Sequence, residues 1–416
     1  MSATTELPAP PPTIGATFRT APTAEPSLLE RFMSSGPEVE IWWDSSPLVF
    51  ETWRRAMLEA APPEARDRLT AELLRLWDPA NPSATSFRGV TTNPPLSLAA
   101  MRDDPERWTA WIEAYRTDHP SADVEEVFWA LYKEIVRLGA EAMRPLFEAS
   151  GRRFGHLSGQ VDPRCAFDSE AMLRQALELS ALAPNVMIKI PGTTEGLPVL
   201  RELTSRGIST NCTSAFIVAQ FVAVAEHVQA GVLDARAAGV DLSGWRSVVT
   251  DMVARWEDAI EFVDEARDQG IELSVEDRRW AGVAVFQEAE RLFRQRAYPS
   301  KMLLCSIRVG PKVDGAEGCW HLEYAAGAQA VFTLPPAFLT EFLPRCDDLA
   351  FPRRIDDDLP ADIIAKLRQV PYFTKGVDLD GVAVDDFDSI PALQNTYRQF
   401  AKATEEMVAF VRERMA

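Results

Sequence analysis

The stretch Asn185-Val186-Met187-Ile188-Lys189-Ile190-Pro191-Gly192-Thr193 is a short apolar run that ends at a turn signal. This composition predicts a strand buried on both faces, which Pro191 and Gly192 bring to an end. Because side chains alternate between the two faces of a strand, Met187 and Lys189 share one face.

Lys189 is the unusual residue of this strand. Lysine is depleted in strands and is almost never fully buried unless it is paired or chemically employed. Burial disfavours the ammonium form, so it can bring the pKa into the range where the free amine attacks carbonyl groups. The alternative is a lysine at the end of the strand whose head reaches solvent or a carboxylate. This stretch alone favours neither.

The residues that follow extend the pattern. Residues 197–206 read as a helix, and residues 208–213 read as another short strand that ends in polar residues. This is a strand-helix-strand unit in which both strands carry polar groups at their carboxyl ends.

The same alternation runs along the chain. Eight short strands, each ending in a polar or charged residue and each followed by helical sequence, lie within residues 38–44, 87–96, 156–164, 185–193, 208–213, 245–255, 302–308 and 330–335. Such alternation predicts a parallel sheet, and eight units suggest a closed barrel with its active site at the carboxyl ends of the strands. We therefore expect an α/β fold, a single (β/α)8 TIM barrel with extra helices. The glycine-rich signatures of dinucleotide-binding and P-loop folds are absent from the sequence.

The first residues differ from the rest. Residues 1–27 are rich in Pro, Ala and Thr and lack an apolar period, so we expect a disordered tail ahead of one barrel domain over residues 28–416. Residues 27–33 read as a short lead-in helix, and residues 105–148 as a long helical region.

Composition narrows the class of protein. The chain has 416 residues, a formal net charge of −19 and a pI of about 4.8, which argues against binding to nucleic acid or an anionic membrane. Five cysteines without a CxxC pair and four histidines suggest neither a disulfide framework nor a metal site. The sequence shows no apolar run of the ~18 residues that a membrane helix needs. It shows no signal peptide either, so we expect a cytoplasmic protein.

The central unit resembles a known family. Residues 186–191, followed by residues 209–213, resemble the Schiff-base lysine strand and the next strand of the transaldolases. The resemblance runs from about residue 38 to the end of the chain. It implies a Schiff base on Lys189, a general acid/base at Asp44 and a Thr-Thr-Asn-Pro motif at residues 91–94. It further implies substrate or water contacts at Asn93, Asn211 and Thr213, and a phosphate site at Thr250, Arg255, Ser306 and Arg308.

The resemblance also implies a reaction. Transaldolases move a dihydroxyacetone unit from a ketose phosphate to an aldose phosphate, without a metal or an organic cofactor. The substrates expected here are therefore sugar phosphates. Local sequence leaves simpler roles open, because Asp44 precedes a Ser/Pro helix start as an N-cap would, and Asn93 precedes a proline as a cap or turn residue would. Arg255 and Arg308 also fit surface or ion-pair roles.

Three residues depart from the family pattern. Gln160 stands where transaldolases have a glutamate that helps to hold the catalytic water, and glutamine cannot act as a base. Met252 stands where they have phenylalanine, and related aldolases that cleave fructose 6-phosphate have tyrosine. Asp251 would weaken phosphate binding if it pointed inward. The alternatives are thus a lyase that releases dihydroxyacetone, as in the fructose 6-phosphate aldolases, or a non-catalytic transaldolase-like barrel.

Overall fold

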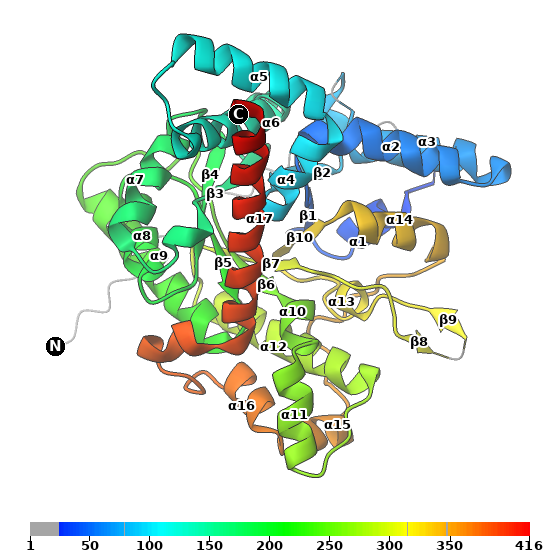
Figure 1. Cartoon of the computed structure of the whole chain (residues 1–416). Coiled ribbons are helices and arrows are strands. Elements are labelled where there is room, and N and C mark those ends of the chain that lie inside the picture. Colours follow the sequence, from blue (N-terminus) through cyan, green and yellow to red (C-terminus); the bar gives the residue numbers. More distant parts are fainter. Residues whose placement is uncertain (1–24, 79, 314, 347) are drawn as a thin grey trace.

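The computed structural model describes residues 25–78, 80–313, 315–346 and 348–416. Eight parallel strands close into a barrel in which each strand pairs with its neighbours in chain order (Figure 1). They are β1 Glu40–Trp43, β2 Phe87–Thr91, β3 His156–Gln160, β4 Val186–Pro191, β5 Thr210–Ala215, β6 Ser247–Met252, β7 Lys301–Cys305 and β10 Ala330–Leu334. The predicted (β/α)8 barrel is confirmed, and each strand lies within its predicted stretch or overlaps it.

Helices surround the barrel (Figure 1), and they are more numerous than the eight that a minimal (β/α)8 barrel needs. The helices are α1 Leu28–Met33, α2 Phe50–Ala60, α3 Pro63–Leu76, α4 Pro94–Asp103, α5 Pro105–Asp118, α6 Val124–Ala149, α7 Ser169–Ser180, α8 Gly196–Ser205, α9 Val218–Ala237, α10 Val253–Glu257, α11 Ile260–Asp268, α12 Val275–Gln295, α13 Trp320–Glu323, α14 Pro336–Arg345, α15 Ala361–Leu367, α16 Pro371–Val377 and α17 Pro391–Met415. Short 3-10 helices are η1 Pro47–Val49, η2 Pro82–Ala84, η3 Pro163–Cys165 and η4 Val384–Ser389, and β8 Lys312–Val313 pairs with β9 Ala316–Glu317 in a small hairpin.

Most predicted helices are confirmed, but the long region over residues 105–148 is two helices. Asp123 begins α6 with a capping box, in which its carboxylate accepts from the Glu126 N–H while the Glu126 carboxylate accepts from the Asp123 N–H, both at 2.9 Å. This reciprocal cap satisfies backbone donors that a continuous helix would have used internally, so the chain starts a new helix there.

The predicted tail lies almost wholly outside the described residues. Described structure starts at residue 25, and α1 begins at Leu28 behind a capping box formed by Ser27 and Glu30. The predicted lead-in helix is therefore confirmed.

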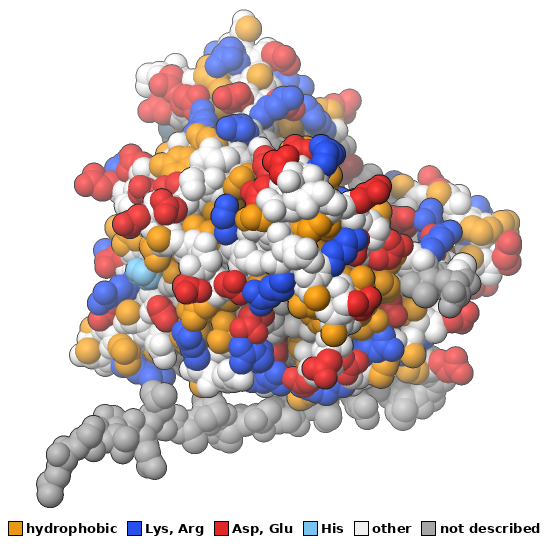
Figure 2. Space-filling view, turned by 90° about the horizontal axis from the view of Figure 1, so that it is seen from below, with side chains coloured by type: hydrophobic (Ala, Val, Ile, Leu, Met, Phe, Trp, Pro, Cys, Tyr) orange, Lys and Arg blue, Asp and Glu red, His pale blue; other side chains and the backbone are white. Residues whose placement is uncertain are grey.

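The C-terminal helix α17 lies beside the carboxyl ends of the strands. It contacts η3 and α10, the first helical turns after β3 and β6, and it also contacts β5. Figure 1 shows α17, in red, running past these strands. Among the described residues, no helix is both long enough and apolar enough to cross a membrane. Acidic and basic side chains are interspersed over the face seen from below in Figure 2.

The opposite end of the barrel is closed by an ion network. The Glu40 carboxylate accepts from Arg246 and Lys301, each at 2.9 Å. Burial alone raises the pKa of Glu40, but the two cations and their hydrogen bonds outweigh it and hold the pKa far below its usual range. Paired charges at the amino ends of the strands are typical of stability rather than catalysis.

Inside the barrel, Trp42 fills space that Gly89 leaves free. Trp42 is fully buried, and a Cβ added at Gly89 would lie 2.6 Å from its ring. We therefore expect Gly89→Ala to lower the free energy of unfolding by about 1–3 kcal/mol through overpacking. Urea denaturation measures this loss. In a Trp42→Leu background the same change should cost less, whereas an equal cost in both backgrounds would contradict the steric explanation.

Candidate active site

Lys189 lies on β4, in register with Gln160 on β3 and Asn211 on β5. It is only 4% exposed, and its Nζ donates to the main-chain oxygen of Thr92 at 3.2 Å. The possibility that the head of Lys189 reaches solvent is therefore wrong, whereas a carboxylate, that of Asp44, does act on its charge.

The environment of Lys189 favours the neutral amine. Burial lowers its pKa, the negative charge of Asp44 opposes that effect, and the positive charge of Arg255 reinforces it, with a lowered pKa as the result. A lower pKa leaves a larger share of the side chain unprotonated at neutral pH, which is the form that adds to a carbonyl carbon.

Asp44 lies directly after β1, where its N–H donates to the Leu334 carbonyl at 3.1 Å. Its Oδ1 accepts a hydrogen bond from the Thr91 hydroxyl at 2.7 Å. The helix-cap alternative for Asp44 is wrong, because the side chain that caps η1 is Ser46, whose Oγ accepts from the Leu48 N–H. The Asp44 carboxyl is thus free of a capping role and faces the lysine's end of the barrel.

The carboxyl of Asp44 holds its proton more firmly than an ordinary aspartate. Burial raises its pKa, and this outweighs the lowering by the Lys189 charge, by the Thr91 hydrogen bond and by Arg255. Opposite shifts in Lys189 and Asp44 bring the two pKa values toward each other, as proton transfer near neutral pH requires.

A threonine pair supports Asp44. The hydroxyl oxygens of Thr91 and Thr333 lie 2.6 Å apart, although β1 separates their strands. Since Thr91 has a single hydroxyl proton and donates it to Asp44, Thr333 donates to Thr91. Thr333 was not among the predicted site residues, although a polar residue inside the apolar run 330–334 was the available signal.

A second hydrogen-bonded chain crosses the barrel interior. Thr250 donates to Asn211 Oδ1 at 2.7 Å, and Asn211 Nδ2 donates to Ser158 at 3.0 Å, although β4 lies between the strands of Ser158 and Asn211. These contacts fix both ends of the Asn211 amide. Thr250, which the resemblance placed in a phosphate site, thus bonds to Asn211 inside the barrel.

Asp251 points away from this interior. It follows Thr250 on β6, so alternation directs it to the outer face of the strand, where it is 1% exposed. Burial and the nearby Glu257 charge raise its pKa well above the usual range. Because the side chain is on the outer face of β6, Asp251 does not oppose phosphate from inside the barrel.

Gln160 and Thr213 lie at the same end of the barrel as Lys189. Gln160 is 2% exposed, and its Oε1 has no hydrogen-bond partner among the described residues. The Thr213 hydroxyl lies 3.9 Å from the sulfur of Met252, a weak acceptor. Both side chains are therefore available to a water molecule or a substrate hydroxyl.

Asn93 caps a helix, as the simpler interpretation proposed. Its Oδ1 accepts from the Leu96 N–H at 3.0 Å at the start of α4. Its Nδ2 has no hydrogen-bond partner in the described part of the chain, so capping leaves one donor for a ligand.

Two arginines come together beyond Lys189. Arg255, on α10, is half-buried, and both burial and the neighbouring charge of Arg308 lower its pKa. Arg308 follows β7 and is exposed, and its Nη1 donates to the Ser306 carbonyl at 3.3 Å. Ser306 has a φ of 60°, a left-handed conformation that is uncommon for a residue other than glycine and is frequent at functional sites. Paired guanidinium groups suit a phosphate.

The last helix holds one of these arginines. Arg255 Nη1 donates to Gln399 Oε1, and its guanidinium carbon lies 5.3 Å from the centre of the Phe400 ring. Gln399 and Phe400 were not predicted, because the contact joins residues 144 positions apart and leaves no local signal. Within the described residues, no group of three or more His, Cys, Asp or Glu side chains is arranged to hold a metal ion.

Comparison with known proteins points to the family that the sequence motifs resemble. The family profile described as Transaldolase/Fructose-6-phosphate aldolase matches residues 67–410. A transaldolase of Thiobacillus denitrificans is 29% identical over 331 residues, which cover 76% of this chain and 89% of the relative.

Two further relatives match over a shorter length. Transaldolase 1 of Streptomyces avermitilis and Transaldolase 1 of Streptomyces coelicolor are each 38% identical, over 182 and 175 residues. These matches cover 46% and 45% of the relatives, so the chain spans less than half of their length. Asp44 precedes the part matched by the family profile, and its place in the site rests on the barrel geometry. Because that profile covers most of the sequence, the chain belongs to the transaldolase/fructose-6-phosphate aldolase family.

Proposed function

We propose that this protein is a transaldolase-type transferase that moves a dihydroxyacetone unit from a ketose phosphate to an aldose phosphate. The observation that carries the proposal is a buried lysine with a lowered pKa, Lys189, within electrostatic range of a carboxyl with a raised pKa, Asp44. Membership of the family supports the same reaction.

The proposed chemistry assigns a step to each group. The neutral amine of Lys189 adds to the ketose carbonyl, and loss of water gives an iminium. Asp44 takes the proton from the hydroxyl beside the bond that breaks, so the aldose phosphate leaves and an enamine remains on the lysine. An incoming aldose phosphate reverses these steps. The fixed amide of Asn211 and the free Nδ2 of Asn93 orient the diol end of the substrate.

The phosphate end is assigned to the arginines. Arg255, Arg308 and Ser306 offer charged and polar donors to the phosphate of either sugar. A local cationic site suits this role because the chain as a whole carries a net charge of −19 and would otherwise repel a sugar phosphate.

We also infer a cytoplasmic location and a domain boundary near residue 27. The five cysteines are free, as expected in a reducing compartment. The first helix of the described residues, α1, begins at Leu28.

A lyase is the second candidate, and Gln160 is the residue that favours it. Its unpartnered Oε1 can hold a water near the enamine. Glutamine supplies no acid for the enamine carbon, however, and among the described residues the partner of the Thr213 hydroxyl is the Met252 thioether, at 3.9 Å. We therefore favour transfer over release.

The test compares release of dihydroxyacetone from fructose 6-phosphate with and without an aldose phosphate. Transfer should be faster than release by on the order of tenfold or more, and Gln160→Glu should change the rate more than the type of reaction. Release as fast as transfer would make the protein a lyase.

A further inference from the structure

We propose that His321 is a positioning residue that holds Arg308 in place to bind the substrate phosphate. The inference rests on the proposed function, in which Arg308 is a phosphate ligand. His321 lies on α13, outside the ring of strands, and was not among the predicted site residues.

The contact is made to the backbone of Arg308. The Arg308 N–H donates to His321 Nδ1 at 3.1 Å, and His321 is 1% exposed. The Arg308 side chain is itself exposed. Among the described residues it donates to the Ser306 carbonyl at 3.3 Å, and its Nε lies 4.0 Å from the Asp258 carboxylate. The buried histidine is thus the fixed point from which this exposed side chain projects.

The hydrogen bonds define the form of the ring. Because Nδ1 accepts a hydrogen bond from the Arg308 N–H, the ring is neutral and its proton lies on Nε2, which donates to Glu257 Oε2 at 3.1 Å. Arg279 Nη1 approaches the same Nε2 at 2.8 Å and directs its own hydrogen bond to the Glu257 carboxylate. Burial lowers the pKa of His321, and the charges of Arg279 and Arg308 reinforce this while Glu257 opposes it. A protonated ring would turn Nδ1 into a second donor facing the Arg308 N–H.

The hydrogen bonds around His321 also reach the helix of Arg255, the other arginine proposed to bind the phosphate. Glu257 lies two positions after Arg255 on the same short helix, α10. His321 therefore links the element that carries Arg255 to the loop that carries Arg308. Space around the link is tight, because a Cβ added at Gly282 would collide with Glu257 Oε2. This geometry sets the distance between the segments that carry Arg255 and Arg308, the two cations proposed to bind one phosphate.

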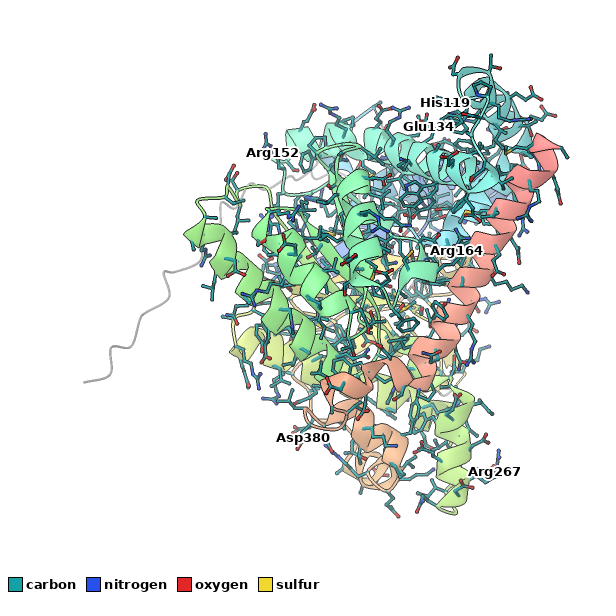
Figure 3. The ribbon with its side chains drawn as sticks, turned by 60° about the vertical axis from the view of Figure 1, so that its left-hand side comes forward. His119, Glu134, Arg152, Arg164, Arg267 and Asp380 are labelled. Atoms are coloured by element: carbon teal, nitrogen blue, oxygen red, sulfur yellow. The ribbon has the colours of Figure 1, made fainter. Side chains whose placement is uncertain are left out.

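Two substitutions test the Nδ1 and Nε2 contacts of His321 separately. His321→Asn places an amide oxygen where Nδ1 accepts from Arg308, but it lacks the donor to Glu257. His321→Gln places its amide where Nε2 meets Glu257, but it lacks the acceptor for Arg308. Both are polar and smaller than or similar to histidine, so both should fold, as thermal unfolding can verify. His119→Asn is the matched control, since His119 is exposed at the edge of the molecule in Figure 3.

The readout is the concentration of ketose that half-saturates borohydride trapping on the lysine. Fructose 6-phosphate carries a phosphate group for Arg255 and Arg308 to bind, whereas dihydroxyacetone carries none. His321→Gln should raise the half-saturating concentration of fructose 6-phosphate by about tenfold, the effect of one lost hydrogen bond to a positioned group, and leave that of dihydroxyacetone unchanged. His321→Asn should stay within about threefold of the wild type for both ketoses.

The outcomes distinguish a failure of the proposed function from a failure of the proposed role of His321. Wild-type protein that traps neither ketose would refute the proposed function itself. Wild-type protein that traps both, with His321→Gln showing equal changes for the two ketoses or no change, would overturn the positioning role alone. Equal losses in the Asn and Gln variants would assign His321 to general packing and would likewise overturn it.

Discussion

Replacement of Lys189 by alanine should abolish sugar transfer, with kcat falling by at least about 10⁴-fold, because it removes the amine that forms the covalent intermediate in the proposed reaction. The variant should remain folded, since removing a buried amine whose charged form is disfavoured leaves only a cavity beside Thr92 and Asn211. Steady-state transfer from fructose 6-phosphate to an aldose phosphate measures the loss, with circular dichroism as the check on folding.

The matched control is a lysine outside the barrel. Lys133, on α6, bonds to Glu178 at 2.8 Å on the outer surface, and Lys133→Ala should keep near-normal transfer. Transfer by Lys189→Ala at more than a few per cent of the wild-type rate would remove the lysine from the covalent role.

Replacement of Asp44 by asparagine should lower kcat by roughly 10²–10⁴-fold while the fold is kept. Asparagine retains an oxygen that accepts the Thr91 hydroxyl, so the chain from Thr333 through Thr91 survives. What it loses is the ability to take and return a proton. The same transfer assay measures the effect, and borohydride trapping of dihydroxyacetone should persist because amine addition uses Lys189.

Ser46→Ala provides the control for this segment. Ser46 caps η1, so its loss should cost about 1 kcal/mol of stability and little activity. If Asp44→Asn behaved as Ser46→Ala does, with a lower melting temperature and intact turnover, Asp44 would have only a structural role.

The sequence predicted the features that depend on residues close together in the chain. A strand that is buried on both faces is recognisable from its own residues, and a lysine inside such a run is anomalous wherever it occurs. For that reason all eight barrel strands were predicted correctly, whereas the stretch around Lys189 left open whether the head of the lysine is buried, and the structure shows that it is. Helix ends followed the same local rules, and the capping box at Asp123 divides the predicted helical region into α5 and α6.

Contacts between distant residues were not accessible in this way. Whether Asp44 caps a helix or serves the site depends on where its carboxyl points once β1 has paired with β10, which local sequence does not reveal. The support of Arg255 by Gln399 joins parts of the chain that only the closed barrel brings together. The resemblance to transaldolases implied a phosphate contact for Thr250, yet its hydroxyl bonds to Asn211 in the interior.

The most direct test of the central claim is to trap the intermediate and locate it. Wild-type protein is incubated with fructose 6-phosphate and borohydride, then digested and mapped by mass spectrometry. We expect an adduct of the reduced dihydroxyacetone or ketose unit on the peptide that contains Lys189, and no adduct in Lys189→Ala. An adduct on a different lysine, or an adduct of equal yield in Lys189→Ala, would contradict a Schiff base at this position.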